Sequence, residues 1–220
     1  MNLQILHEDE HIIVCYKPAG IPTQTKKLGE QDMVSLLKNY LKGGYVAVIH
    51  RLDQPVEGLL VFAKTPFAAK ELNKGLQGSG FGKHYKAVLW GVPTQKKATL
   101  EDYLVKDGRT NTSRVCNSSE KDVKKAILSY EVIATGKDDG KGISLVKVKL
   151  DTGRHHQIRV QMANMGCPIW GDAKYNTAMV QDRRYRQIAL CAYRLEFVHP
   201  KTKKQMEFEI EPKGEGFSCF

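Results

Sequence analysis

The chain has 220 residues, 41% of them hydrophobic, and a formal net charge of +10. This hydrophobic content is typical of a globular protein, and no apolar stretch approaches the roughly 18 residues that a membrane-spanning helix needs. The acidic start "MNLQILHEDEH" does not resemble a signal peptide, and five scattered cysteines without a C-x-x-C pair favour neither a disulfide framework nor a zinc ribbon, so we expect a cytoplasmic protein with reduced thiols.

In chain order, the hydrophobic pattern predicts a strand within 11–20, a helix over 32–42, strands over 45–50 and 58–64, and a helix over 66–76. Strands follow over 83–91, 98–105, 124–133 and 143–150. A helix over 154–166 and strands over 187–200 and 205–210 complete the chain. Strands outnumber helices and follow one another directly. The pattern therefore predicts an α+β fold with a mixed, largely antiparallel central sheet and flanking helices, in one domain over 1–220.

Residues at the helix ends support these assignments. Asp32 is a plausible N-cap, Pro66 stands in a first turn, where its missing N–H costs nothing, and Gly166 is suited to end the third helix.

The excess of 34 Lys and Arg over 24 Asp and Glu favours a polyanionic partner, with nucleic acid as the first candidate. Short basic clusters are more often solvated loops than binding sites. Four such clusters occur, at 26–27, 121–125, 183–186 and 201–204.

The glycine-rich stretch 75–84 fits neither common phosphate-binding motif. A P-loop does not match because residue 77 is Gln and residue 84 is His, and a dinucleotide fingerprint starting at Gly78 would need glycine where Lys83 stands. We expect a flexible connection between a helix and a strand. The adjacent His155 and His156 do not form H-E-x-x-H, so we predict no metal site.

Two constellations are more informative. In "HRLDQPVEGLLVFAKT" (50–65), Asp53 lies on a Pro- and Gly-containing turn between two apolar runs, where rigid strands can hold a side chain at the edge of a cleft. An Asx-type turn residue is the alternative. In "LDTGRHHQIRVQMANMGCPIWGDAKY" (150–175), arginines at the start of a helix oppose its dipole, which suggests that they bind a carboxylate or RNA phosphates.

Together, these stretches resemble the H-R-L-D and L-x-T-G-R-x-H-Q-I-R motifs of the RluA family of RNA pseudouridine synthases. The opening "ILHEDEHIIVCYKPAGIPTQ", the strand "KHYKAVLWG" and the closing "IALCAYRLEFVHP" also resemble the family, except that Cys191 stands where histidine is common. The resemblance spans nearly the whole chain. It implies isomerisation of uridine to pseudouridine in ribosomal or transfer RNA, without a cofactor or metal.

The resemblance also assigns roles to residues. Asp53 would be the catalytic carboxylate, which either attacks C1′ of the ribose or removes the 2′ proton; both mechanisms stay open. Tyr85 would stack on the target base, and Arg159 would pair with Asp53. Arg51 would fill the space left by the flipped nucleotide. The other residues expected to contact RNA are His50, Arg154, His156 and Gln157.

Two departures from the family pattern stand out. Val56 and Glu57 replace the usual Thr-Ser, which removes two hydroxyls and adds a negative charge beside a turn that we expect to face RNA. The catalytic pattern also begins within the first ten residues, where many relatives carry an S4 domain. We therefore expect a monomer that recognises a compact RNA stem-loop with its catalytic domain.

Two other functions compete with this interpretation. A catalytically silent RNA-binding protein would not need all the expected catalytic residues. A nucleoside hydrolase would need a second carboxylate, for which Glu57 is the nearby candidate.

Overall fold

The computed structural model describes residues 3–78, 80–178 and 186–220. The chain divides into two compact units. The first contains Met1–Lys83 and Ala192–Pro212, and the second contains His84–Cys191 and Lys213–Phe220. Strands β5 (Phe81–Trp90) and β10 (Leu190–Val198) have residues in both units. The single domain expected over 1–220 stays a prediction.

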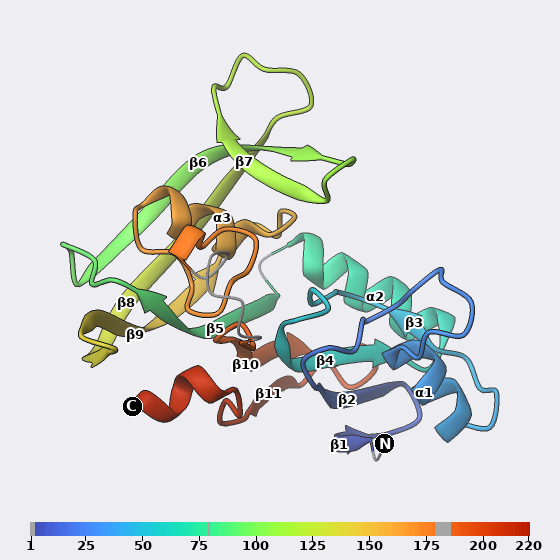
Figure 1. Cartoon of the computed structure of the whole chain (residues 1–220). Helices are drawn as coiled ribbons and strands as arrows, with labels where there is room; N and C mark the ends of the chain where they lie inside the picture. Colours follow the sequence, from blue (N-terminus) through green and yellow to red (C-terminus); the bar gives the residue numbers. More distant parts are fainter. Residues whose placement is uncertain (1–2, 79, 179–185) are drawn as a thin grey trace. The chain divides into compact units, whose positions relative to one another are not determined.

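The first unit is built on strands in the order β1-β2-β4-β10, with β3 paired to β4 and β11 paired to β10 (Figure 1). Pairs β1–β2, β2–β4, β3–β4 and β10–β11 are antiparallel. Every residue of β4 is buried, and an apolar core forms around Val14, Leu59 and Phe197. The strands of this unit not yet defined are β1 (Gln4–Glu8), β2 (Ile12–Lys17), β3 (Ala47–Val48), β4 (Glu57–Ala63) and β11 (Gln205–Glu209).

Two helices belong to the first unit. One begins after the predicted N-cap Asp32, and the other has Pro66 in its first turn, as predicted. Helix α1 (Met33–Tyr40) starts with a capping box, in which the Asp32 side chain accepts from the Ser35 N–H and the Ser35 hydroxyl accepts from the Asp32 N–H. Helix α2 (Pro66–Gln77) is capped by Thr65. It packs against β3 and β4 (Figure 1).

The second unit is an antiparallel sheet in the order β5-β9-β8-β6-β7 (Figure 1). Helix α3 (Gln157–Asn164) packs against β6 and β7, and the 3-10 helix η1 (Glu215–Cys219) packs against β8. Apolar clusters around Trp170 and around Val160 form its core. The other strands are β6 (Lys97–Asp107), β7 (Thr112–Cys116), β8 (Lys124–Asp138) and β9 (Lys141–Leu150).

These elements confirm the predicted α+β class and the largely antiparallel pairing. The prediction over 45–50 was too long, because only the two-residue strand β3 forms there. Helix α3 begins at Gln157 rather than at 154, because His156 adopts left-handed backbone angles (φ 53°) that an α-helix does not contain. Strands β1 and β7 and helix η1 were not predicted.

The structure also bears on the expectations about the cysteines, membrane-spanning helices and basic clusters. All five cysteines are free thiols, and Cys15, Cys167 and Cys191 are buried. No helix in the described ranges is long and apolar enough to cross a membrane. Residues 183–185 of the basic cluster 183–186 lie outside the described residues.

Candidate active site

The segment that carries Asp53 is fixed by hydrogen bonds on both sides of this residue. On one side, the Thr23 hydroxyl lies 3.1 Å from the Leu52 amide nitrogen and 3.0 Å from the Leu52 carbonyl oxygen. On the other side, the Gln54 carbonyl accepts from the Gly20 N–H at 2.9 Å. Asp53 itself is partly exposed. Its backbone is therefore held between two anchored peptides, as a positioned functional side chain requires.

The buried side chain of Lys17 links the segment that carries Asp53 to the loop over 18–21 by hydrogen bonds. Its side chain is fully buried, and its ammonium donates to the carbonyls of Pro18, Ile21 and Gln54 at 2.9, 2.6 and 3.0 Å. Burial lowers the pKa of Lys17 from 10.5 to about 7, and the charges of Asp53 and Glu57 oppose that change. Lys17 thus acts as a buried positioning residue for the backbone next to Asp53.

Glu57 differs from our expectation. We predicted a negative charge beside an RNA-facing turn, but Glu57 is only 1% exposed and accepts a short hydrogen bond from the Tyr16 hydroxyl. The physical reason is that Glu57 is the first residue of strand β4, in which every residue is buried, and its carboxylate lies within hydrogen-bond distance of Tyr16 on β2. A buried, hydrogen-bonded carboxylate is poorly placed to be the second acid of a nucleoside hydrolase.

The two residues that open this segment differ in exposure. Arg51 is exposed. His50 packs edge-on against Phe81 at 5.2 Å between ring centroids and accepts from the Val61 N–H through Nε2. Burial, with a contribution from the charge of Lys83, lowers the pKa of His50 to about 3, so its ring is neutral at pH 7. This packing gives His50 a structural role, and contact with RNA stays a prediction.

In the second unit, Arg159 on α3 forms a bidentate ion pair with Asp172. Its Nε and Nη2 donate to the two carboxylate oxygens at 2.8 and 2.7 Å, and both side chains are at most 5% exposed. The guanidinium also lies over the Tyr175 ring, 5.1 Å from its centroid. The two hydrogen bonds and the contact with the aromatic ring fix the orientation of the Arg159 guanidinium plane. A fixed guanidinium suits a residue that must direct its N–H donors toward one partner.

The residues before α3 form a hydrogen-bonded turn. Gln157 accepts from the Thr152 hydroxyl and the Arg154 N–H and donates to the Ile127 carbonyl, so its amide holds the turn in place. The Nδ1 atom of His156 lies 2.7 Å from the Tyr175 hydroxyl oxygen. Burial and then the charge of Arg159 lower the pKa of His156 to about 3. Arg154 is exposed, with its Nε bound to the Lys125 carbonyl.

Tyr85 completes the set of predicted catalytic residues. It is 7% exposed and lies on β5, where it is paired with Val148 of β9. Asp53 lies in the first unit, whereas Tyr85 and Arg159 lie in the second. The pairing of Arg159 with Asp53 therefore stays a prediction, as do the RNA contacts of Arg51, Arg154, His156 and Gln157.

Sequence reasoning missed three residues of this region. Lys17 stands in the "KPAG" of the first motif, and Asp172 and Tyr175 stand in the "GDAKY" that ends the second motif. The motif signal was present, but their partners lie up to 62 residues away in the sequence. No local pattern indicates such partners.

Comparison with known proteins identifies the family. A family model described as RNA pseudouridylate synthase matches residues 11–164. The chain is 33% identical over 206 residues to an uncharacterized RNA pseudouridine synthase, YhcT, of Bacillus subtilis, covering 91% of this chain and 66% of that protein. It is 29% identical to the dual-specificity RNA pseudouridine synthase RluA of Pasteurella multocida, covering 96% of this chain and 93% of the relative.

The fold agrees with this assignment. The structure of human RNA pseudouridylate synthase domain containing 1 superimposes with a TM-score of 0.81 at 23% identity, covering 96% of this chain and 84% of the human one. The chain therefore belongs to the RNA pseudouridylate synthase family, the enzymes that isomerise uridine in RNA to pseudouridine.

Proposed function

We propose that this protein converts specific uridines of ribosomal or transfer RNA to pseudouridine, with Asp53 as the catalytic carboxylate. The observation that carries the proposal is the anchoring of Leu52 by Thr23 and of Gln54 by Lys17, which fixes the backbone of the one carboxylate in the H-R-L-D motif. The family members of Zymomonas mobilis and Vibrio vulnificus are a ribosomal large subunit synthase and a transfer RNA synthase, which supports this substrate class.

The chemistry needs one ionised acid near the sugar. Breaking the glycosidic C–N bond builds positive charge on the ribose, and a preorganised carboxylate stabilises or traps that charge. The freed uracil then turns and bonds to C1′ through C5. C5 loses its proton and N1 gains one, so the product is an isomer of uridine and no water and no second carboxylate are consumed. We propose that Arg159, oriented by Asp172, keeps Asp53 ionised, and that Tyr85 stacks on the uracil.

The target base must leave its helix before it can react. Flipping costs roughly a few kcal/mol, and we propose that Arg51 offsets this cost by filling the vacated space. Arg154 and the basic clusters at 121–125 and 201–204 would bind neighbouring phosphates. We further propose that the protein acts as a cytoplasmic monomer, as one catalytic domain over 1–220, without a cofactor.

The test is conversion of total RNA from a strain that lacks the gene, with pseudouridine mapped by mass spectrometry. We expect the wild-type protein to restore specific pseudouridines, and Asp53→Asn to lower the single-turnover rate at least about a thousandfold while RNA affinity stays within about twofold. Asp139→Asn is the matched control, because Asp139 is exposed at a positive φ that asparagine tolerates. Conversion by Asp53→Asn at the wild-type rate would refute the assignment.

A further inference from the structure

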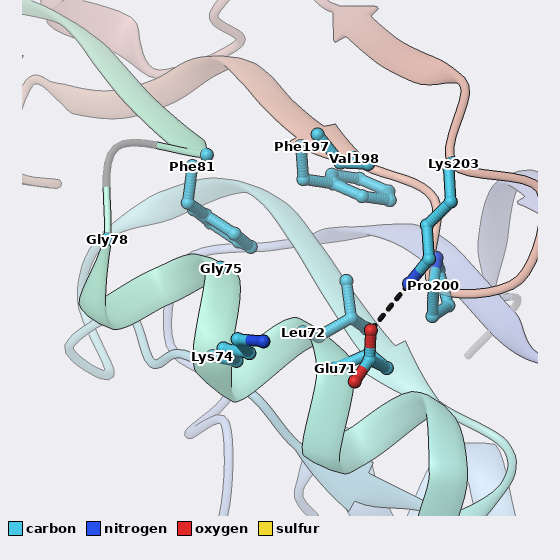
Figure 2. Close-up of a pocket in the computed structure, with 11 residues that line it drawn as sticks. Glu71, Leu72, Lys74, Gly75, Gly78, Phe81, Phe197, Val198, Pro200 and Lys203 are labelled. Carbon is cyan, nitrogen blue, oxygen red and sulfur yellow. Dashed lines mark hydrogen bonds and ion pairs between the residues drawn. The ribbon is translucent and has the colours of Figure 1, made fainter.

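The first unit contains a hollow that is not lined by any of the candidate catalytic residues Asp53, Tyr85 and Arg159. It has a volume of about 300 Å³ and lies between the C-terminal half of α2, the start of β5, and the end of β10 with the loop that follows it (Figure 2). Small-molecule pockets range from about 300 to 1,000 Å³, so this volume suits a ligand of nucleotide size.

One side of the hollow is aromatic. Phe81 stacks on Phe197, with 5.9 Å between centroids and 23° between planes, and Leu72 adds an apolar surface. Figure 2 shows the Phe81 ring pointing into the hollow between Gly75 and Phe197. A flat apolar surface of this kind favours stacking of a nucleobase, because every base has a π-face.

Another side of the hollow is formed by glycine residues, which have no side chain. Gly75, Gly78 and Gly80 all line the hollow. A Cβ added at Gly75 or Gly80 would meet no atom closer than 3.8 Å, so at these two positions the absence of a side chain leaves room rather than avoiding a clash.

The rim is positively charged. Lys74 and Lys203 line the hollow, and Lys203 forms an ion pair with Glu71. The hydrogen bond from Lys203, with smaller contributions from the charges of Lys74 and Lys70, lowers the pKa of Glu71. Lys201 and Lys204 are exposed in the same loop. A free anion inside the hollow would meet the Glu71 carboxylate, whereas a phosphate on the outer rim would meet lysines.

The loop that supplies Lys203 is anchored. The His199 ring accepts from the N–H groups of Lys201 and Thr202 through Nδ1, and its Nε2 lies 2.9 Å from an Asp9 carboxylate oxygen. The hollow is also linked to the catalytic segment, because Phe81 packs against His50, three residues before Asp53.

We propose that this hollow is a second nucleotide site for the RNA substrate. An unpaired base stacks on Phe81, and an adjacent phosphate binds Lys74 and Lys203. This inference rests on the proposed function, because it takes RNA as the ligand. It assigns Gly75, Gly78 and Gly80 a role in binding a base, although the glycine-rich sequence around them lacks a phosphate-binding motif.

The first test removes the charges. The probe is a fluorescein-labelled 12-nucleotide oligouridylate, with affinity measured by anisotropy. The variant is Lys74→Gln with Lys203→Asn, since asparagine tolerates the φ of 59° at residue 203. We expect about a tenfold loss of affinity and a salt dependence reduced by about two phosphate contacts. Lys70→Gln is the matched control, because Lys70 lies on α2 but is not among the residues that line the hollow; we expect a loss below about twofold. Equal losses in the two proteins would overturn the proposal.

The second test fills the hollow without changing charge. Gly75→Met places a side chain in it, whereas Gly75→Ala leaves most of the volume, and either residue suits a helix better than glycine. Uridine monophosphate should shift the amide resonances of Gly75, Gly80 and Phe81 in the wild-type protein and in Gly75→Ala but not in Gly75→Met. Inorganic phosphate that shifts the same amides with the same affinity would overturn the proposal, because the site would then be a simple anion site.

The two proposals fail separately. If the wild-type protein makes no pseudouridine in total RNA but uridine monophosphate shifts these amides and Gly75→Met abolishes the shifts, the proposed function fails and the hollow is still a nucleotide site. If conversion occurs and Gly75→Met binds the oligouridylate as the wild-type protein does, the nucleotide site is refuted and the function stands.

Discussion

At the scale of single residues, two carboxylates four positions apart have different environments. Asp53 lies on an anchored, partly exposed segment, whereas Glu57 is buried in β4 and accepts a hydrogen bond from Tyr16. The family pattern has serine at the position of Glu57. In this chain the extra carboxylate accepts a hydrogen bond from a phenol, which reduces the cost of burying it.

The Tyr16 hydroxyl provides a test of this buried pair. We expect Tyr16→Phe to lower the free energy of unfolding by about 1–3 kcal/mol, because a buried carboxylate loses a hydrogen-bond donor. Tyr40→Phe is the matched control, since the Tyr40 hydroxyl donates to the exposed Glu8, and its effect should stay within about 0.5 kcal/mol. Urea denaturation measures both. Similar small losses in the two variants would show that Glu57 does not depend on Tyr16.

At the scale of elements, local patterns predicted those whose signals are local. The cap of α1, Pro66 in the first turn of α2 and the buried runs of β2 and β4 are visible in the sequence, because capping and hydrophobic period act over a few residues. Strand β7 was missed because it is a short hairpin partner of β6 without strong alternation. Helix α3 begins late because of the backbone angles of His156, which periodicity does not reveal.

A substitution at Gly58 tests how closely the backbone of β4 approaches that of β10. A Cβ at this position would lie 2.5 Å from the Ala192 amide nitrogen, and φ is +137°. We therefore expect Gly58→Ala to lower the free energy of unfolding by more than about 2 kcal/mol, because backbone has to move. Gly20→Ala separates strain from clash, since Gly20 has φ +86° with nothing within 4 Å, and should cost only about 1 kcal/mol. The urea denaturation midpoints of the two variants distinguish a steric clash from backbone strain. Equal losses in the free energy of unfolding would exclude a clash with Ala192.

At the scale of the whole molecule, charge bears on both the expected RNA affinity and the stability in acid. The net charge of +10 favours RNA over most other partners. Two histidines bear on stability in acid, because desolvation lowers the pKa of His50 and that of His156 to about 3, against 6.5 for an exposed imidazole. As the pH falls from 6.5 towards 3, the unfolded chain binds protons at these positions before the folded protein does.

We therefore expect the free energy of unfolding to fall over this pH range, by up to about 1.4 kcal/mol per pH unit for each histidine. Urea titrations at pH 7, 6, 5 and 4 measure the slope. The double variant His50→Gln with His156→Gln should be less stable at pH 7 and should lose most of the slope. A slope unchanged in the double variant would show that other groups control acid unfolding.

The sequence alone determined the α+β class, most strands and helices, the family motifs and Asp53 as the candidate acid. These follow from residue period, capping and ordered motifs, all of which are local in the chain. The tertiary structure decided that Arg159 pairs with Asp172, that Lys17 reaches the carbonyls of Pro18, Ile21 and Gln54, and that Glu57 is buried. It also placed three glycines beside Phe81 and Lys203. Such partners are set by packing between segments distant in sequence, which the order of residues does not display.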